Sequence, residues 1–224
     1  MDGVALLLSL KLALATTLLL LLAGIPVAAW IAFSRRRWKF LVEAVVALPL
    51  VLPPTVLGLC VLVALGPKSP LGRLWEAATG HGLAFTFEGL LLASVLYSLP
   101  FAVQPFASAF ASVEPSLLEA SWCLGVSRAG TFLRVVLPLS RRGLVTGAVL
   151  SFAHTLGEFG VVLMVGGNIP GLTRTASISI YDDVQALDYG RAGATAMLLL
   201  AVSVTVLLLT YGLRRDVRGT APWR

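Results

Sequence analysis

Two ionisable residues, His154 and Glu158, lie four positions apart in the apolar run 142–166. Residues at this spacing share one face of a helix. Ionisable groups inside a membrane are costly, so they usually face protein or water. We consider two roles: the pair lines a path or meets a second copy, or the two side chains satisfy each other and fix helix packing. No paired motif such as H-E-x-x-H is present, so we predict no catalytic residue and no metal site.

The run GGNIPGLT, residues 166–173, has the glycine spacing of a phosphate-binding loop. The lysine that must reach the phosphates is replaced by Leu172, and the run follows an apolar helix instead of a strand. The sequence therefore does not predict an ATP site. Asn168, Pro170 and Gly171 are typical of a tight turn, and Asn168 is a candidate residue at the end of a path.

The elements that position these residues are predicted to be membrane helices. The chain is 58% hydrophobic and 12% charged, with mean hydropathy +0.91, whereas soluble domains are about a quarter charged. In such a chain the net charge of +6 indicates basic cytoplasmic loops and not nucleic-acid binding. Cys60 and Cys123 lie in contexts that favour packing over a disulfide or a metal site.

We predict an all-α integral membrane protein of about five spans: 4–33, 41–65, 85–111, 142–166 and 191–213. Basic residues follow spans 1, 3 and 5 and place those ends in the cytoplasm, so the N-terminus lies outside and the C-terminus inside. The residues concerned are Arg35, Arg36, Arg37, Lys39, Arg128, Arg134, Arg141, Arg142, Arg214, Arg215, Arg218 and Arg224. Without an internal repeat, residues 1–224 form one domain.

The second span contains three prolines, Pro49, Pro53 and Pro54, which kink or break a helix. A membrane tolerates this where neighbouring protein or a water-filled cavity satisfies the freed backbone groups. We therefore expect this span to face other helices or a path. Thr55 is a candidate path residue, or it bonds only its own helix.

Residues 112–140 between spans 3 and 4 are too polar to span a membrane. Pro115 suits a first helical turn, and Gly125 suits a helix end. Leu117, Leu118, Ser121 and Leu124 fall at helical spacing on one face. Ser127 is expected to cap a second helix that stops before Pro138, and Ser140 to cap span 4. Residues 113–127 contain no basic residue, which favours docking on protein over lying on lipid.

This stretch resembles the cytoplasmic EAA loop of ABC-importer permeases, with Ser121 for the second Ala and Val135 for the Ile of that pattern. The resemblance implies that the loop is a coupling helix seated in a groove of a separate ATPase subunit. The matching residues are Glu119, Ala120, Gly125, Leu137 and Pro138.

Three further stretches, 48–58, 151–171 and 173–181, look like the molybdate-type permeases. This implies a permease subunit for molybdate or tungstate in a prokaryotic cell membrane. The chain would be a homodimer with two ATPase subunits, which bind ATP and Mg, and an external oxyanion-binding protein. No cofactor is expected on this chain, and His154 stands where the pattern favours Arg. A sulfate or thiosulfate permease remains an alternative, as does a self-contained secondary transporter.

Overall fold

The computed structural model describes residues 2–215, and for residues 209–215 only the backbone. The described part is helical, without a strand. In chain order its elements are α1 (Gly3–Phe33), α2 (Lys39–Val51), α3 (Pro54–Leu65), α4 (Pro70–Thr79), α5 (Phe87–Ala111), α6 (Pro115–Cys123), α7 (Arg128–Thr131), the π-helical turn η1 (Phe132–Val136), α8 (Leu137–Leu139), α9 (Arg141–Leu156), α10 (Gly160–Gly166), α11 (Ala176–Gln185) and α12 (Tyr189–Arg215).

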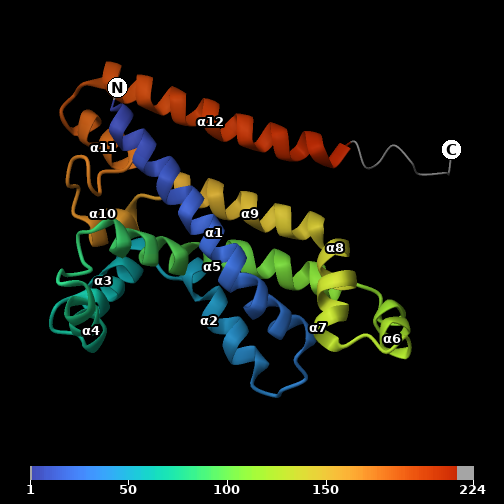
Figure 1. The fold of residues 1–224 in the computed structure, drawn as a ribbon. Coiled ribbons are helices and arrows are strands. Elements are labelled where there is room, and N and C mark those ends of the chain that lie inside the picture. Colours follow the sequence, from blue (N-terminus) through green and yellow to red (C-terminus); the bar gives the residue numbers. More distant parts are fainter. Residues whose placement is uncertain (1, 216–224) are drawn as a thin grey trace.

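Three long helices, α1, α5 and α9, pack together at the centre of the molecule (Figure 1). The largest core cluster includes Leu20 of α1 with Val103 and Phe106 of α5. A Cβ at Gly147 of α9 would lie 2.9 Å from the Ala102 carbonyl oxygen. Glycine at this position therefore permits the close approach of α5 and α9 that small residues allow in membrane bundles.

Three helices, α1, α5 and the described part of α12, are long and apolar enough to cross a membrane. Two bent helix pairs raise the number to as many as five. The predicted span 41–65 is one of these pairs: α2 and α3 meet at 115°, because Leu52 and Pro53 are extended. The break predicted from the prolines is confirmed, and it divides the span into two helices.

The predicted span 142–166 also differs from a single helix. Its helix α9 ends at Leu156, residues 157–159 leave the helical path, and α10 begins at Gly160. The second bent pair instead joins Arg128–Leu139 to Arg141–Leu156 at 71°. The continuous apolar run hid this division because hydropathy does not report a change of chain direction.

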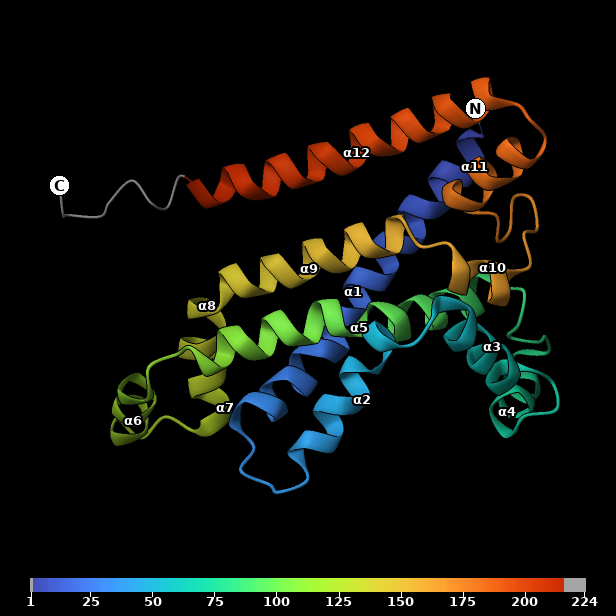
Figure 2. The ribbon, with the colours of Figure 1, turned by 180° about the vertical axis from the view of Figure 1, so that it is seen from behind.

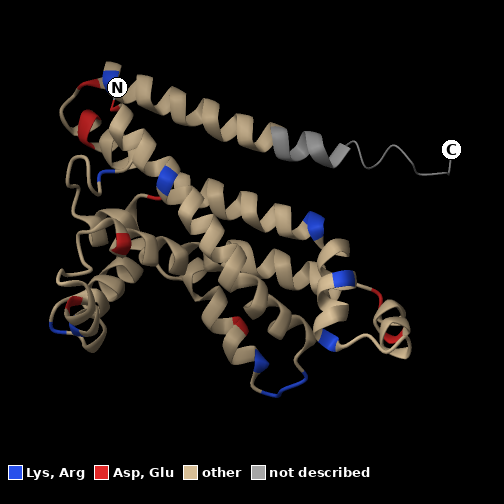
Figure 3. Cartoon of the chain, in the orientation of Figure 1, with Lys and Arg blue, Asp and Glu red and all other residues tan. Residues whose placement is uncertain are grey.

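Basic residues gather at one end of the bundle, on the α1–α2 connection and from α7 to the start of α9 (Figure 3). This is the arrangement that the positive-inside rule leads us to expect for a cytoplasmic end. The opposite end holds the N-terminus, α4 and α11. The assignment of inside and outside stays a prediction, and the predicted basic tail, from Arg214 to Arg224, lies outside the residues whose side chains are described.

Helix α12 runs along the outside of the bundle and packs mainly on α11 and α9 (Figure 2). Many of its exposed side chains are large and apolar, among them Met197, Leu200 and Leu208. Such a surface suits lipid or another apolar partner.

Candidate functional site

Helix α6 begins and ends where local sequence signals predict. Pro115 occupies its first turn and Glu114 is the N-cap residue, although the Glu114 side chain makes no capping bond. Its carboxylate instead accepts a hydrogen bond from the Ser116 hydroxyl at 2.7 Å. Gly125 adopts φ +78°, a left-handed conformation that glycine takes at little cost, and this ends the helix.

Helix α6 projects away from the bundle (Figures 1 and 2). Glu119 and Ala120 are exposed, as are Trp122 and Leu124, the latter at 83%. The single apolar face predicted for this helix is in fact divided. Leu118 packs against the core and Ser121 is buried, whereas Leu117 and Leu124 face outward because α7 covers only one side.

Ser127 caps the second helix as predicted, by accepting a bond from the Gly130 amide. The prediction that this helix stops before Pro138 is wrong. The chain continues through η1 into α8, and the Leu137 amide bonds the Phe132 carbonyl. The wider π turn accommodates a proline that would clash in an ordinary α-helix.

Ser140 stands at the N-cap of α9, but its side chain does not cap it. The Ser140 hydroxyl donates instead to the Ala109 carbonyl of α5 at 3.2 Å. The predicted cap is therefore replaced by a bond between two long helices.

The structure divides the five predicted coupling residues into two groups. Glu119, Ala120 and Gly125 are exposed on α6 and the turn after it. Leu137 and Pro138 lie beyond η1, where Leu137 packs against the core and Pro138 is exposed. The first group can contact a partner directly, and the second lies where the hairpin joins the bundle.

His154 and Glu158 do not share a helix face, because α9 ends between them. Ser98 of α5 bonds the His154 Nδ1 at 2.9 Å and the Thr155 hydroxyl at 2.8 Å. The imidazole also stacks on Phe101, with ring centroids 4.0 Å apart. His154 is therefore satisfied by α5 and not by Glu158.

Glu158 lies in the break between α9 and α10 and is 4% exposed. Among the described residues no hydrogen bond forms at either of its carboxyl oxygens, and the buried Ser94 hydroxyl of α5 is likewise without a hydrogen-bond partner. Within the part of the chain that the structure describes, this carboxyl therefore has no hydrogen-bond partner, and a buried polar group in that state is costly. The sequence analysis did not single out Ser94 and Ser98. Their spacing of four in an apolar span, which places both hydroxyls on one face of a helix, could have identified them.

Two path candidates remain, Thr55 and Asn168. Thr55 is exposed at the start of α3. Asn168, half-buried after α10, has φ 59°, donates to both Asp182 carboxylate oxygens and accepts from the Arg174 Nε at 2.8 Å. The predicted turn is confirmed, and the Asn168 side chain holds the turn against α11.

The acidic residues of the 167–190 segment are paired within the chain instead of simply solvated. Asp182 lies 3.5 Å from Arg174. Asp183 and Asp188 lie 3.8 Å and 3.9 Å from the Nε atom of Arg191. These carboxylates therefore help to fold the segment.

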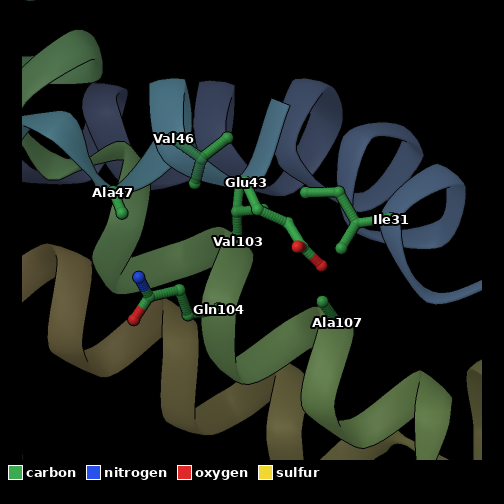
Figure 4. A pocket seen from close by; sticks show the side chains of 7 residues that line it. All are labelled: Ile31, Glu43, Val46, Ala47, Val103, Gln104 and Ala107. Atoms are coloured by element: carbon green, nitrogen blue, oxygen red, sulfur yellow. The ribbon is translucent and has the colours of Figure 1, made fainter. Parts of the chain in front are cut away.

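A cavity of about 300 Å³ lies between α1, α2 and α5 (Figure 4). Its lining is apolar apart from Glu43 and Gln104, and Glu43 is 3.5 Å from Lys39. A carboxylate in an apolar lining does not suit an anion. None of the four path candidates lines this cavity.

The family described as "Binding-protein-dependent transport system inner membrane component" matches residues 24–218. The chain is 50% identical over 218 residues to the molybdenum transport system permease protein ModB of Azotobacter vinelandii, covering 97% of this chain and 96% of the relative. It is 35% identical over 181 residues to a probable sulfate transport system permease protein of Chlorella vulgaris, covering 80% and 68%.

Solved structures share the fold at low identity. The MetNI methionine ABC transporter in inward-facing conformations aligns with TM-score 0.73 and 18% identity, over 95% of this chain and 94% of that one. A bacterial alginate ABC transporter, in complex with alginate pentasaccharide-bound periplasmic protein, aligns with TM-score 0.74 and 19% identity, over 97% and 80%. At these identities the likeness establishes the fold alone.

Proposed function

The chain belongs to the family of binding-protein-dependent transport system inner membrane components. We propose that it is the permease subunit of an ATP-driven importer of molybdate or tungstate. The substrate class is inferred from the 50% identity to a molybdenum permease over nearly the whole of both chains. The sulfate-type relative matches less closely and over less of its length.

The chain acts as a transport subunit and not as an enzyme. ATP and Mg are bound and ATP is hydrolysed on a separate ATPase subunit, of which the complex contains two copies. Two copies of this chain form the membrane part, in the cell membrane of a prokaryote. An external binding protein delivers the oxyanion, in line with the periplasmic protein seen with the alginate transporter.

Helix α6 is the proposed contact with the ATPase. It projects from the bundle, and its outer surface combines the Glu119 carboxylate with exposed Leu117 and Trp122. Aromatic side chains such as Trp122 are enriched at the centre of protein interfaces, whereas charged side chains such as Glu119 belong to their polar rim. Gly125 lets the chain turn back at once toward the bundle.

The proposed path passes the two broken spans. Backbone that leaves helical geometry at membrane depth is tolerated where it is buried in protein or lines a water-filled cavity. The backbone leaves helical geometry at 52–53 and at 157–159. Thr55, His154 and Glu158 lie beside these two breaks. Asn168 is retained as a candidate at the outer end, where it shapes the turn.

The proposal is tested by reconstituting this chain with its ATPase in liposomes. Binding protein loaded with molybdate, tungstate or sulfate is added, and ATP hydrolysis and ion uptake are measured together. We expect molybdate or tungstate to stimulate both activities, and sulfate to stimulate neither. Stimulation by sulfate alone would support the sulfate permease, and uptake without the ATPase would support a secondary transporter.

A further inference from the structure

Helix α6 is joined to the rest of the protein by few contacts. Among the described elements it packs against α7 and η1. Its inward side chains are Leu118, which reaches the core cluster, and Ser121, which is 8% exposed. A helix held by so few contacts can move independently of the bundle unless a specific bond restrains it.

Such a bond links α6 to α7. The Ser121 Oγ lies 2.9 Å from the Thr131 Oγ1, and Thr131 is 2% exposed. Two buried hydroxyls that bond each other are satisfied, whereas either one alone is a buried polar group without a partner. The EAA pattern has alanine at position 121, so this bond is a property of the present chain and not of the pattern.

The connection continues from Thr131 into both central helices. Phe132, the next residue, contacts Phe110 of α5 edge to face, with ring centroids 5.3 Å apart. Beyond η1 and α8, the Ser140 hydroxyl bonds the Ala109 carbonyl of α5. Gly143 of α9 is packed against Ala109. These contacts therefore connect α7 to the α5–α9 pair that positions His154.

We propose that the Ser121–Thr131 hydrogen bond makes α6 and α7 one rigid lever, and that these two positioning residues set how much transport results from each ATP hydrolysed. This inference rests on the proposed function, because it assigns α6 to the ATPase contact. It goes further by naming the pair that transmits the movement.

The first experiment measures the lever in the permease alone, by hydrogen–deuterium exchange in detergent. Ser121→Ala should speed amide exchange in residues 117–127 about fivefold, as loss of one neutral hydrogen bond implies. Ser121→Thr keeps the hydroxyl and should leave exchange unchanged. Ser151→Ala is the matched control, because Ser151 is buried and, among the described residues, its hydroxyl bonds the Gly147 carbonyl of its own helix alone. Equal exchange in Ser121→Ala and wild type would overturn the proposal.

The second experiment measures molybdate imported per ATP hydrolysed by the reconstituted importer. Ser121→Ala and Thr131→Val should each lower this ratio at least twofold, and the double variant should lower it no further, because both changes remove the same bond. Ser121→Thr should retain the wild-type ratio. Ser121→Ala failing to assemble with the ATPase while Ser121→Thr assembles would also support the proposal.

The two experiments separate failure of this inference from failure of the proposed function. A wild-type complex that imports no molybdate would refute the proposed substrate, while the exchange result would still show whether the bond fixes α6. If the wild-type complex imports molybdate and both single variants keep its ratio of molybdate imported to ATP hydrolysed, only the proposed role of the Ser121–Thr131 bond is refuted.

Discussion

Gly160, the first residue of α10, lies against Pro54, the first residue of α3: a Cβ on Gly160 would be 2.8 Å from the Pro54 Cβ. The predicted spans 41–65 and 142–166 therefore meet where the chain resumes a helix after each break, at the start of α3 and the start of α10. The contact extends along both helices, since a Cβ on Gly58 would be 2.8 Å from the Met164 Cβ. Glycine at these positions lets α3 and α10 approach each other closely, as small residues do in membrane bundles.

Substitution at this contact should destabilise the protein. We expect Gly160→Ala to lower the free energy of unfolding by about 1–3 kcal/mol, because overpacking forces neighbouring groups apart. Gly193→Ala in α12 is the control, since a Cβ there meets nothing within 4 Å. The midpoint of thermal unfolding in detergent measures both. A Gly160→Ala protein as stable as the control variant would show that the breaks are not in firm contact.

Charge reversal on α6 should separate assembly from folding. Glu119 is exposed, so Glu119→Lys should change the unfolding free energy by less than about 0.5 kcal/mol. We expect its affinity for the ATPase to fall about tenfold, equivalent to about 1.4 kcal/mol, as measured by titration of the purified subunits. Glu76→Lys on the exposed face of α4 serves as the control. Undiminished binding and transport by Glu119→Lys would remove Glu119 from the proposed contact.

Ser98 should be more important to stability than its size suggests. Ser98→Ala leaves the His154 and Thr155 side chains without their shared partner, and we expect a loss of about 1–3 kcal/mol. The control is Ser151→Ala, which removes a buried hydroxyl bonded only within its helix. Equal unfolding midpoints for the two variants would mean that the bridge between α5 and α9 contributes little.

Glu158 and Asp183 should respond differently to the same chemical change. Because the Glu158 carboxyl has no hydrogen-bond partner among the described residues, Glu158→Gln should leave the unfolding free energy unchanged within about 1 kcal/mol or raise it. Asp183 faces Arg191 at 3.8 Å, so Asp183→Asn should lower it. Thermal unfolding of the two variants side by side is the measurement. A loss of more than about 2 kcal/mol in Glu158→Gln would reveal a partner for its carboxylate.

Features encoded by neighbouring residues were predicted well. The helical membrane class followed from hydropathy, and the limits of α6 followed from Pro115 and Gly125. The proline break near Leu52 also follows from local chemistry, since a missing amide and a fixed φ act where they occur. The continuation past Pro138 was missed because a π turn can absorb a proline, and no local signal distinguishes it from a helix end.

Contacts between distant residues were decided only by the packing of the helices. The spacing of His154 and Glu158 allowed a mutual pair as one of two roles, yet His154 bonds Ser98 because α5 lies beside α9 and the helix ends before Glu158. The Ser121–Thr131 bond likewise depends on how the hairpin folds back. Hydropathy and turn chemistry describe each segment separately, whereas the choice among several possible partners depends on which helices approach closely, and that is set by side-chain volumes across the whole bundle.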